Sequence, residues 1–165
     1  MSEMNIIQQA LTSWRVHNEI NLTLLKNISA KGLDAVPAES RGRTVAKQLA
    51  HVHNVRYAWL YYNSPTLVKR IPRFRKNDKP NKRVLASAFR LSSAAVEQFL
   101  KQKLENGERI KMFKGSPIRW MAYLISHESH HRGQIALALK QSGKKLPQSV
   151  AINELWYRWY WDKKK

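Results

Sequence analysis

Residues 116–143 read SPIRWMAYLISHESHHRGQIALALKQSG, and this stretch decides the fold class. Ser116 belongs to the residue types that cap helix N-termini, and Pro117 suits the first helical position. Gly143 stands where the end of a helix requires a left-handed residue. The apolar residues between these signals recur at three- and four-residue steps. We therefore predict one long helix over this stretch.

Three further stretches have apolar residues at helical spacing together with start or stop signals. They are residues 5–31 followed by Gly32, residues 45–62 capped by Thr44, and residues 82–105 capped by Asn81 and ended by Asn106 and Gly107. Residues 66–80 cannot continue a helix because prolines interrupt them, but they are long enough to cross over between the second and third helices. With no convincing alternating strand, the sequence predicts an all-α, antiparallel-type four-helix bundle with a long crossover connection.

The length of 165 residues predicts a single domain, residues 1–165. The chain has no cysteine, which excludes disulfides and thiolate metal sites. No stretch approaches ~20 uninterrupted apolar residues, and the N-terminal residues lack the pattern of a signal peptide. We therefore expect a cytoplasmic protein with no membrane partner.

The chain is strongly basic, with 30 Lys and Arg against 11 Asp and Glu and a formal net charge of +19. Such a charge favours anionic partners, including nucleic acid and negatively charged small molecules, although a solvated surface kept soluble by repulsion explains it equally well. The densest run is residues 69–83, KRIPRFRKNDKPNKR, with Phe74 among its cations. Basic groups around an aromatic ring can hold phosphates and stack a base, but a mobile solvated loop is the favoured interpretation. The candidate polyanion-binding residues are Lys69, Arg70, Arg73, Arg75 and Lys76.

Histidines supply the candidate chemistry of the central helix. His127 and His131 are four residues apart, so their imidazoles lie one above the other on one face and can bind one metal ion. His51, in the second helix, is the candidate third ligand, since His53 points about 200° away around the helix axis. Three neutral imidazoles leave coordination positions for water or substrate, and nitrogen ligation suits zinc or nickel.

His127, Glu128 and His131 also match H-E-x-x-H, the helical signature of zinc peptidases. Such an enzyme needs a third ligand, for which Glu154 is the only suitable downstream carboxylate, and it needs a sheet that this short chain lacks. Glu128 instead has two local explanations: it orients a metal-bound imidazole, or it forms a surface ion pair with Arg132. Glu128 and His130 are nevertheless the candidate catalytic residues, His130 as a proton shuttle or an exposed bystander.

Three other features give expectations that the structure can test. His17 lies on or beside the inward stripe of the first helix, where a hydrogen-bonded core histidine is the usual finding. Gly133 costs about 1 kcal/mol relative to alanine within a helix, so it is expected to allow close approach of a neighbouring helix or ligand. The aromatic tail, residues 153–165, is expected to form a short helix or a lid that covers one end of the bundle.

Two segments carry a family resemblance: LAHVHNVRYAWL, residues 49–60, and HESHHRGQI, residues 127–135. Together they resemble the DinB-like (DNA-damage-inducible) superfamily of four-helix-bundle metalloproteins, which includes bacillithiol- and mycothiol-dependent transferases. The resemblance implies that His51, His127 and His131 bind a divalent metal ion. It also implies a homodimer and, in some members, transfer of a low-molecular-weight thiol to an electrophilic substrate. His53 and His130 are additional histidines beside the ligand positions, and replacement of a neighbouring ligand by either one stays open at this point.

The resulting hypothesis is a metal-dependent enzyme, a thiol S-transferase or a hydrolase, in which the ion activates a thiol or water for attack on a small electrophile. Two alternatives remain open at this point. One is a basic module that binds nucleic acid or another polyanion, and the other is a metal-bound scaffold without turnover.

Overall fold

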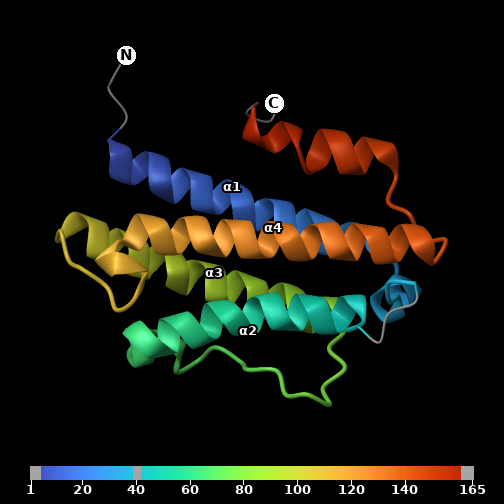
Figure 1. Cartoon of the computed structure of the whole chain (residues 1–165), viewed down its shortest axis with the longest axis horizontal. Helices are drawn as coiled ribbons and strands as arrows, with labels where there is room; N and C mark the ends of the chain where they lie inside the picture. The colour runs from blue at the N-terminus through green and yellow to red at the C-terminus, as the bar shows by residue number, and fades with distance from the viewer. Residues whose placement is uncertain (1–4, 39–41, 161–165) are drawn as a thin grey trace.

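The computed structural model describes residues 5–38 and 42–160, and this part of the chain forms four long helices (Figure 1). They are α1 (Ile6–Asn27), α2 (Val45–Asn63), α3 (Lys82–Glu105) and α4 (Pro117–Gln141). Short helical turns connect them, and no strand occurs within the described residues. The prediction of an all-α four-helix bundle is therefore confirmed. None of the described helices is both long and apolar enough to span a lipid bilayer.

The order of the helices in space follows from one long connection. α1 packs against α3 and α4, and α2 packs against the same two helices. The segment between α2 and α3 runs back along the bundle, so α2 and α3 point the same way, as do α1 and α4 (Figure 1). The predicted crossover is confirmed. α1 and α4 therefore run antiparallel to α2 and α3, whereas the pairs α1–α4 and α2–α3 are parallel.

The predicted helix caps explain where three of the helices begin. Ser116 Oγ accepts a hydrogen bond from Arg119 N (3.2 Å), Thr44 Oγ1 from Lys47 N (3.3 Å), and Asn81 Oδ1 from Val84 N (3.0 Å). Each bond satisfies one of the amide groups that a helix N-terminus leaves without an internal partner. At the other end of α4, Gly143 has φ +69° and ends the helix as predicted.

The end of α1 differs from the prediction. α1 ends at Asn27, and the next residues form a 3-10 turn, Ala30–Asp34, that contains Gly32. The reason is local, because Ile28 is extended and the Ser29 side chain caps the turn by accepting a hydrogen bond from Gly32 N (3.0 Å). Gly32 therefore belongs to this turn and is not the residue that ends α1.

A polar layer divides the core into two apolar halves. One half gathers around Leu49 and Phe89, and the other around Trp14 and Trp120. Between them every long helix contributes buried polar side chains at the same level: His17, Asn18 and Asn21 from α1, Arg56 from α2, Ser92 from α3 and Glu128 from α4. This layer places charged groups at mid-bundle, beside the candidate metal centre.

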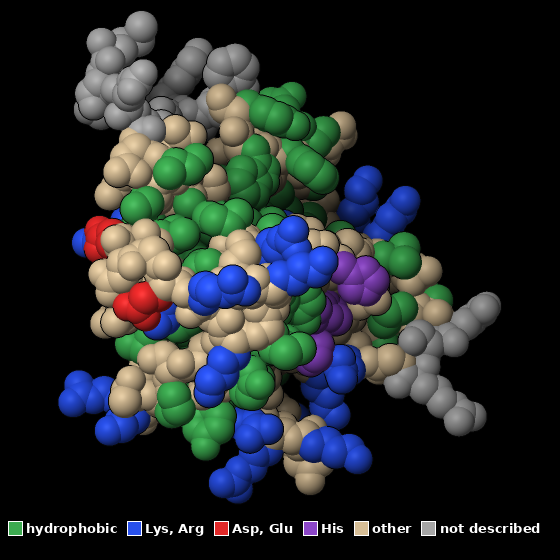
Figure 2. Space-filling model, turned by 60° about the vertical axis from the view of Figure 1, so that its left-hand side comes forward, with side chains coloured by type: hydrophobic (Ala, Val, Ile, Leu, Met, Phe, Trp, Pro, Cys, Tyr) green, Lys and Arg blue, Asp and Glu red, His purple; other side chains and the backbone are tan. Residues whose placement is uncertain are grey.

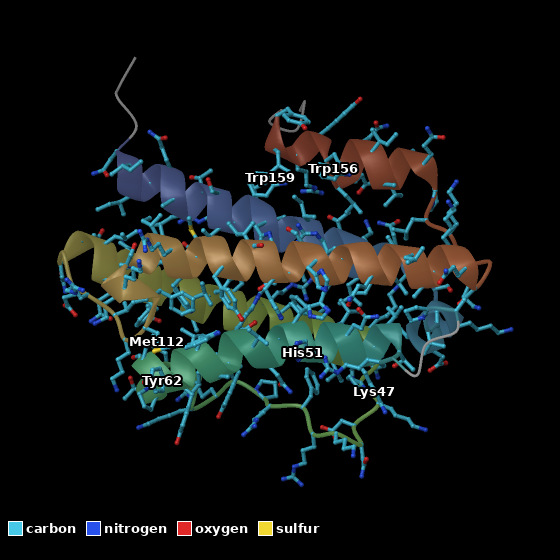
Figure 3. All side chains as sticks on the ribbon, viewed as in Figure 1. Lys47, His51, Tyr62, Met112, Trp156 and Trp159 are labelled. Atoms are coloured by element: carbon cyan, nitrogen blue, oxygen red, sulfur yellow. The ribbon has the colours of Figure 1, made fainter. Side chains whose placement is uncertain are left out.

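The C-terminal segment lies along the side of α1 and does not cover an end of the bundle (Figures 1 and 3). It contains a π-helical turn, Val150–Glu154, and a 3-10 turn, Tyr157–Trp159. Its buried anchors are aliphatic, with Val150 packed inward, whereas Trp156 is 62% exposed. The expectation that the aromatic side chains of this segment form a lid over the bundle end is wrong for residues 153–160. Residues 161–165 lie outside the described part of the chain.

Gly133→Ala is expected to raise the free energy of unfolding by about 0.5–1 kcal/mol. Gly133 is exposed on α4, and a Cβ atom at this position would meet no atom within 4 Å. The expected close approach of a neighbour is therefore absent, and alanine gains helix propensity at no steric cost. Urea denaturation measures the change. Gly143→Ala is the control of opposite sign, because its φ of +69° disfavours any Cβ atom by about 1 kcal/mol.

Candidate metal centre

Three histidines from two facing helices meet at mid-bundle. The ring centroid of His51, on α2, lies 5.3 Å from that of His127 and 4.9 Å from that of His131, both on α4. The two α4 rings are 4.7 Å apart, as expected for residues separated by one helical turn. One nitrogen from each ring lies within 4.8 Å of the other two. The structure thus brings together the three residues selected from the sequence.

The donor set fits a single divalent ion. Zinc lies ~2.1 Å from an imidazole nitrogen, so the nitrogens of a tetrahedral site are about 3.4 Å apart. Side-chain rotations that bring the most distant nitrogens about 1.4 Å closer together would therefore complete the site. The Nδ1 atoms of His127 and His131 are buried and have no hydrogen-bond partner within the described residues. Buried polar atoms without partners are costly, which argues against a satisfied polar cluster and for a site that takes a ligand.

All three imidazoles favour the neutral form that binds metals. Burial lowers the pKa of His51, and the nearby Arg43 guanidinium and His127 lower it further. Burial also lowers the pKa of His127. For His131, burial followed by the neighbouring His127 and His51 rings lowers the pKa to about 4. A metal ion therefore has few protons to displace at neutral pH.

The metal-free protein is expected to lose stability as the pH falls from about 6.5 to about 4. The unfolded chain takes up a proton at His131 near pH 6.5, whereas the folded protein does so only near pH 4. Between these values the unfolded state binds more protons, so acidification favours unfolding. Urea denaturation in the presence of a chelator at pH 7, 5.5 and 4.5 measures this loss. His131→Gln should reduce the slope of the free energy of unfolding against pH by the contribution of at most one proton. An equal reduction in His130→Gln would contradict the assignment to His131.

His53 does not belong to the histidine triad. It is fully buried on the α3 side of α2, where its Nε2 donates to the Pro72 carbonyl (2.6 Å) and its Nδ1 lies 3.2 Å from Ser92 Oγ. Both ring nitrogens therefore have protein partners. The separation of His51 and His53 around the helix axis, expected from their spacing, explains why only His51 reaches the triad.

His130 lies at the rim of the site. Its side chain is exposed, its ring centroid is 5.4 Å from that of His131, and its Nε2 lies 2.9 Å from Gln134 Nε2. It therefore stands beside the triad without joining it. A role as a proton shuttle stays a prediction.

Glu128 is neither a surface residue nor a partner of the triad. It is fully buried, and Arg56 forms a two-pronged ion pair with it at 2.7 and 2.6 Å. Its Oε2 also accepts hydrogen bonds from Asn21 Nδ2 (2.6 Å) and from His17 Nε2 (2.8 Å). The expected surface ion pair with Arg132 is wrong, and so is the expectation that Glu128 orients a triad imidazole. Glu128 belongs to the polar layer.

The environment of Glu128 excludes the role that a zinc peptidase requires. Burial is the largest single influence and would raise the pKa of its carboxyl group, but Arg56 and His17 together outweigh burial and hold the pKa well below its usual range. A carboxylate so stabilised and so fully engaged does not accept a proton from a metal-bound water. Glu128 is therefore a poor candidate for catalysis, and the H-E-x-x-H reading has no support in the geometry.

His17 is a core histidine, as its position on the inward stripe suggested. Burial lowers its pKa, so the ring is neutral at physiological pH. Its partners assign the tautomer: Nε2 donates to Glu128, and Nδ1 faces an Arg132 guanidinium nitrogen at 3.4 Å. The Arg132 guanidinium also donates to Asn21 Oδ1 (2.9 Å) and thereby closes the outer side of the polar layer.

Aromatic side chains border the triad on one side. The Tyr123 ring stacks on His127 at 5.8 Å with an interplanar angle of 23°. Phe113 and Trp59 follow, with ring centroids 5.2 and 6.1 Å from that of Tyr123. Aromatic groups of this kind offer apolar area beside a polar centre.

Basic residues border the other side. A cavity of about 460 Å³ opens beside His51, and Arg75 and Lys76 of the predicted basic run line it. Figure 2 shows histidine side chains at the surface with Lys and Arg side chains around them. The other three candidates for polyanion binding, Lys69, Arg70 and Arg73, do not line this cavity.

Two cations of this cavity, Arg43 and Lys47, were missed from the sequence. A signal for Lys47 was present, since it precedes His51 by four residues and so lies on the same face of α2.

Arg56 was also missed. It stands on the apolar stripe of α2 between Val52 and Leu60, and a charge in such a position indicates a buried partner.

A four-helix bundle with a histidine triad shared by two facing helices defines the class of this protein. A family model described as the DinB family matches residues 1–163. The chain therefore belongs to the DinB family. No curated protein shows significant similarity to it.

Proposed function

We propose that this protein is a divalent-metal-dependent enzyme that activates a thiol for transfer to a small electrophile. His51, His127 and His131 would hold the ion, zinc or nickel. The observation that carries the proposal is the convergence of three neutral imidazoles whose buried Nδ1 atoms, at His127 and His131, lack hydrogen-bond partners within the described residues. Three protein ligands are the number found in catalytic sites that keep a position open.

The bound ion would supply one element of the chemistry, which is a lower pKa of a coordinated thiol or water. The surrounding residues support the rest. The stacked Tyr123 ring offers a flat apolar surface for an electrophile beside His127, and the cationic cavity lies beside His51. In the transfer, a sulfur–carbon bond forms, the bond from that carbon to the leaving group breaks, and the thiol proton passes to solvent.

Cobalt substitution tests this function directly. Metal-free protein loaded with one equivalent of Co²⁺ is expected to show visible bands of a site with fewer than six ligands. Addition of mercaptosuccinate, a thiol that carries two carboxylates, is expected to add a sulfur-to-cobalt charge-transfer band. Absence of cobalt binding would overturn the metal site, and bound cobalt without the charge-transfer band would overturn thiol activation. His130→Ala, which alters a neighbouring histidine outside the triad, is the matched control.

The homodimer stays a prediction that follows from the family resemblance. Sedimentation velocity across a tenfold range of protein concentration tests it, and a sedimentation coefficient of a monomer throughout would contradict it.

A further inference from the structure

We propose that Arg43, Lys47 and Lys76 form an anion subsite beside the histidine triad, which binds the carboxylate or phosphate groups of a small molecule whose reacting end lies at His51. This inference deepens the proposed function and rests on it only for the position of the reacting end. The subsite itself follows from the shape, charge and anchoring of the cavity.

The cavity connects the cations to the triad. Its lining includes His51 on α2 together with Arg43 just before that helix and Lys76 from the crossover segment. A second cavity of about 470 Å³ shares Arg43 and extends to His131. Arg43 thus stands between two hollows that each reach a triad histidine. Volumes of this size are typical of sites for small molecules.

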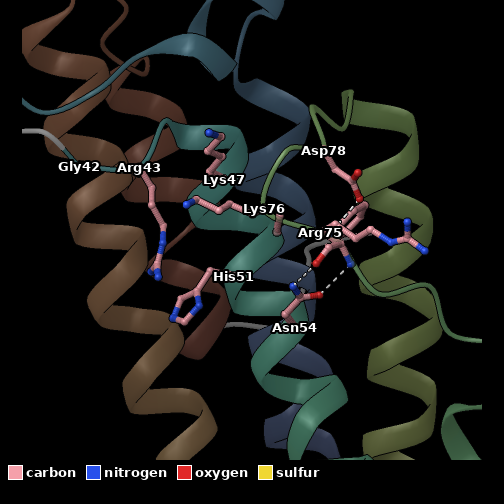
Figure 4. Close-up of a pocket in the computed structure, with 10 residues that line it drawn as sticks. Gly42, Arg43, Lys47, His51, Asn54, Arg75, Lys76 and Asp78 are labelled. Atoms are coloured by element: carbon pink, nitrogen blue, oxygen red, sulfur yellow. Dashed lines mark hydrogen bonds between the residues drawn. The ribbon is translucent and has the colours of Figure 1, made fainter.

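All three cations line the cavity, and Arg43 and Lys76 extend toward the same side of it, whereas the Lys47 ammonium group points away from the His51 ring. In Figure 4 the Arg43 guanidinium lies next to the His51 ring, and the Lys76 side chain extends toward the side of Arg43 and Lys47. The Arg75 side chain points away, so this residue contributes mainly its backbone to the cavity. The electrostatic influence of Arg43 on the triad is consistent with this placement, since Arg43 contributes to lowering the pKa values of both His51 and His131.

These three cations outnumber the acidic residues of the cavity lining. No ion pair within residues 5–38 and 42–160 involves the side chains of Arg43, Lys47 or Lys76. The one acid in the lining, Asp78, accepts a hydrogen bond from the backbone N of Arg75 (2.8 Å). Three like charges facing one hollow repel each other, and a bound anion would relieve that repulsion. A guanidinium beside two ammonium groups also matches carboxylate and phosphate oxygens geometrically.

The crossover segment is anchored, which distinguishes it from the solvated loop favoured by the sequence. Asn54 on α2 binds both backbone groups of Phe74, donating to its carbonyl (2.8 Å) and accepting from its N–H (3.0 Å), as the dashed lines in Figure 4 show. The Phe74 side chain packs against the core, with its ring centroid 5.3 Å from that of His53. Lys76 is therefore held two residues beyond a fixed point over α2.

The test is binding of two probes, citrate and inorganic pyrophosphate, to the metal-free full-length chain, measured by calorimetry at constant ionic strength. Citrate reports on carboxylates and pyrophosphate on phosphates. The subsite variant is Arg43→Gln/Lys47→Gln/Lys76→Gln. The matched control is Lys69→Gln/Arg70→Gln/Arg73→Gln, which also removes three charges near α2 but none that lines the cavity. Circular dichroism and urea denaturation establish that both variants remain folded.

We expect at least one probe to bind the wild-type protein. The subsite variant should bind the same probe at least about tenfold more weakly, and the control variant should bind it as tightly as wild type does. Equal loss in both variants would show a diffuse charge effect and would overturn the proposal, as would no binding to wild type. A DNA oligonucleotide is the third probe. If it binds wild-type protein and its affinity falls mainly in the control variant, the basic run binds nucleic acid instead, and the proposal of an anion subsite is overturned.

A separate arm distinguishes failure of the subsite from failure of the metal site. His127→Ala in the metal-free protein should keep full affinity for the probe, because this side chain lines neither of the two cavities that contain Arg43. In wild type, the probe should shift the imidazole resonances of His51 in NMR spectra and leave those of His17 unchanged. Probe binding without a His51 shift would place the anion elsewhere and overturn the proposal.

Discussion

His131→Ala is expected to lower the affinity of the protein for zinc by at least about 100-fold. Loss of a residue that only orients a metal ligand already costs about 10–100-fold in affinity, and removal of a ligand itself costs more. His131 is the most buried of the three histidines, so its position offers little room for a replacement water. Competition with a chromophoric chelator at pH 7 measures the affinity, and elemental analysis of the purified protein gives the occupancy.

His130→Ala is the matched control for this experiment. It removes an imidazole from the adjacent position of the same helix, and its ring lies 5.4 Å from that of His131. Its zinc affinity should stay within about threefold of wild type, a margin smaller than any effect expected for loss of an outer partner. If the two variants lose zinc equally, or if wild type binds none, the assignment of the triad is wrong.

Arg56→Met is expected to lower the free energy of unfolding by about 3–5 kcal/mol. Arg56 and Glu128 are both fully buried, and methionine would leave the carboxylate with only its neutral hydrogen-bond donors, Asn21 and His17. Burial of an uncompensated charge is among the most destabilising changes in a protein core. Urea denaturation of the metal-free protein measures the difference and separates it from any effect of metal binding.

Arg15→Met is the matched control, because Arg15 pairs with Glu97 on the surface with half of its side chain exposed. That variant should lose at most about 1 kcal/mol. The double variant Arg56→Met/Glu128→Leu removes both buried charges and should recover part of the loss. A loss at Arg56→Met no larger than that at Arg15→Met would contradict the importance of the buried pair.

The sequence predicted well whatever depends on local periodicity and caps. Ser116, Thr44 and Asn81 begin their helices as expected, and the i, i+4 spacing of His127 and His131 placed both rings on one face. His51 followed from a helix-axis argument that also separated it from His53. These inferences succeed because they depend on helix geometry within a single element.

The sequence predicted poorly whatever depends on contacts between helices. The two roles expected for Glu128, orienting a metal-bound imidazole or pairing with Arg132 at the surface, were both wrong, because its partner Arg56 is 72 residues away. Gly133 was expected to meet a neighbour, although the fold leaves open space there. Arg43 and Lys47 could be recognised as parts of a cationic cavity only after the crossover segment had placed Lys76 in the same lining. Pairing of distant residues is set by packing, which periodicity alone does not encode.

The polar layer at mid-bundle also fixes how far each helix can slide along its neighbours. A displacement of one turn, about 5.4 Å, would move Arg56 against hydrocarbon and separate it from Glu128. Purely apolar faces tolerate such slips far better, whereas buried polar contacts are known to specify axial register. Because Glu128 adjoins His127 on α4, the same contact sets the height at which the α4 imidazoles face His51 across the helix pair.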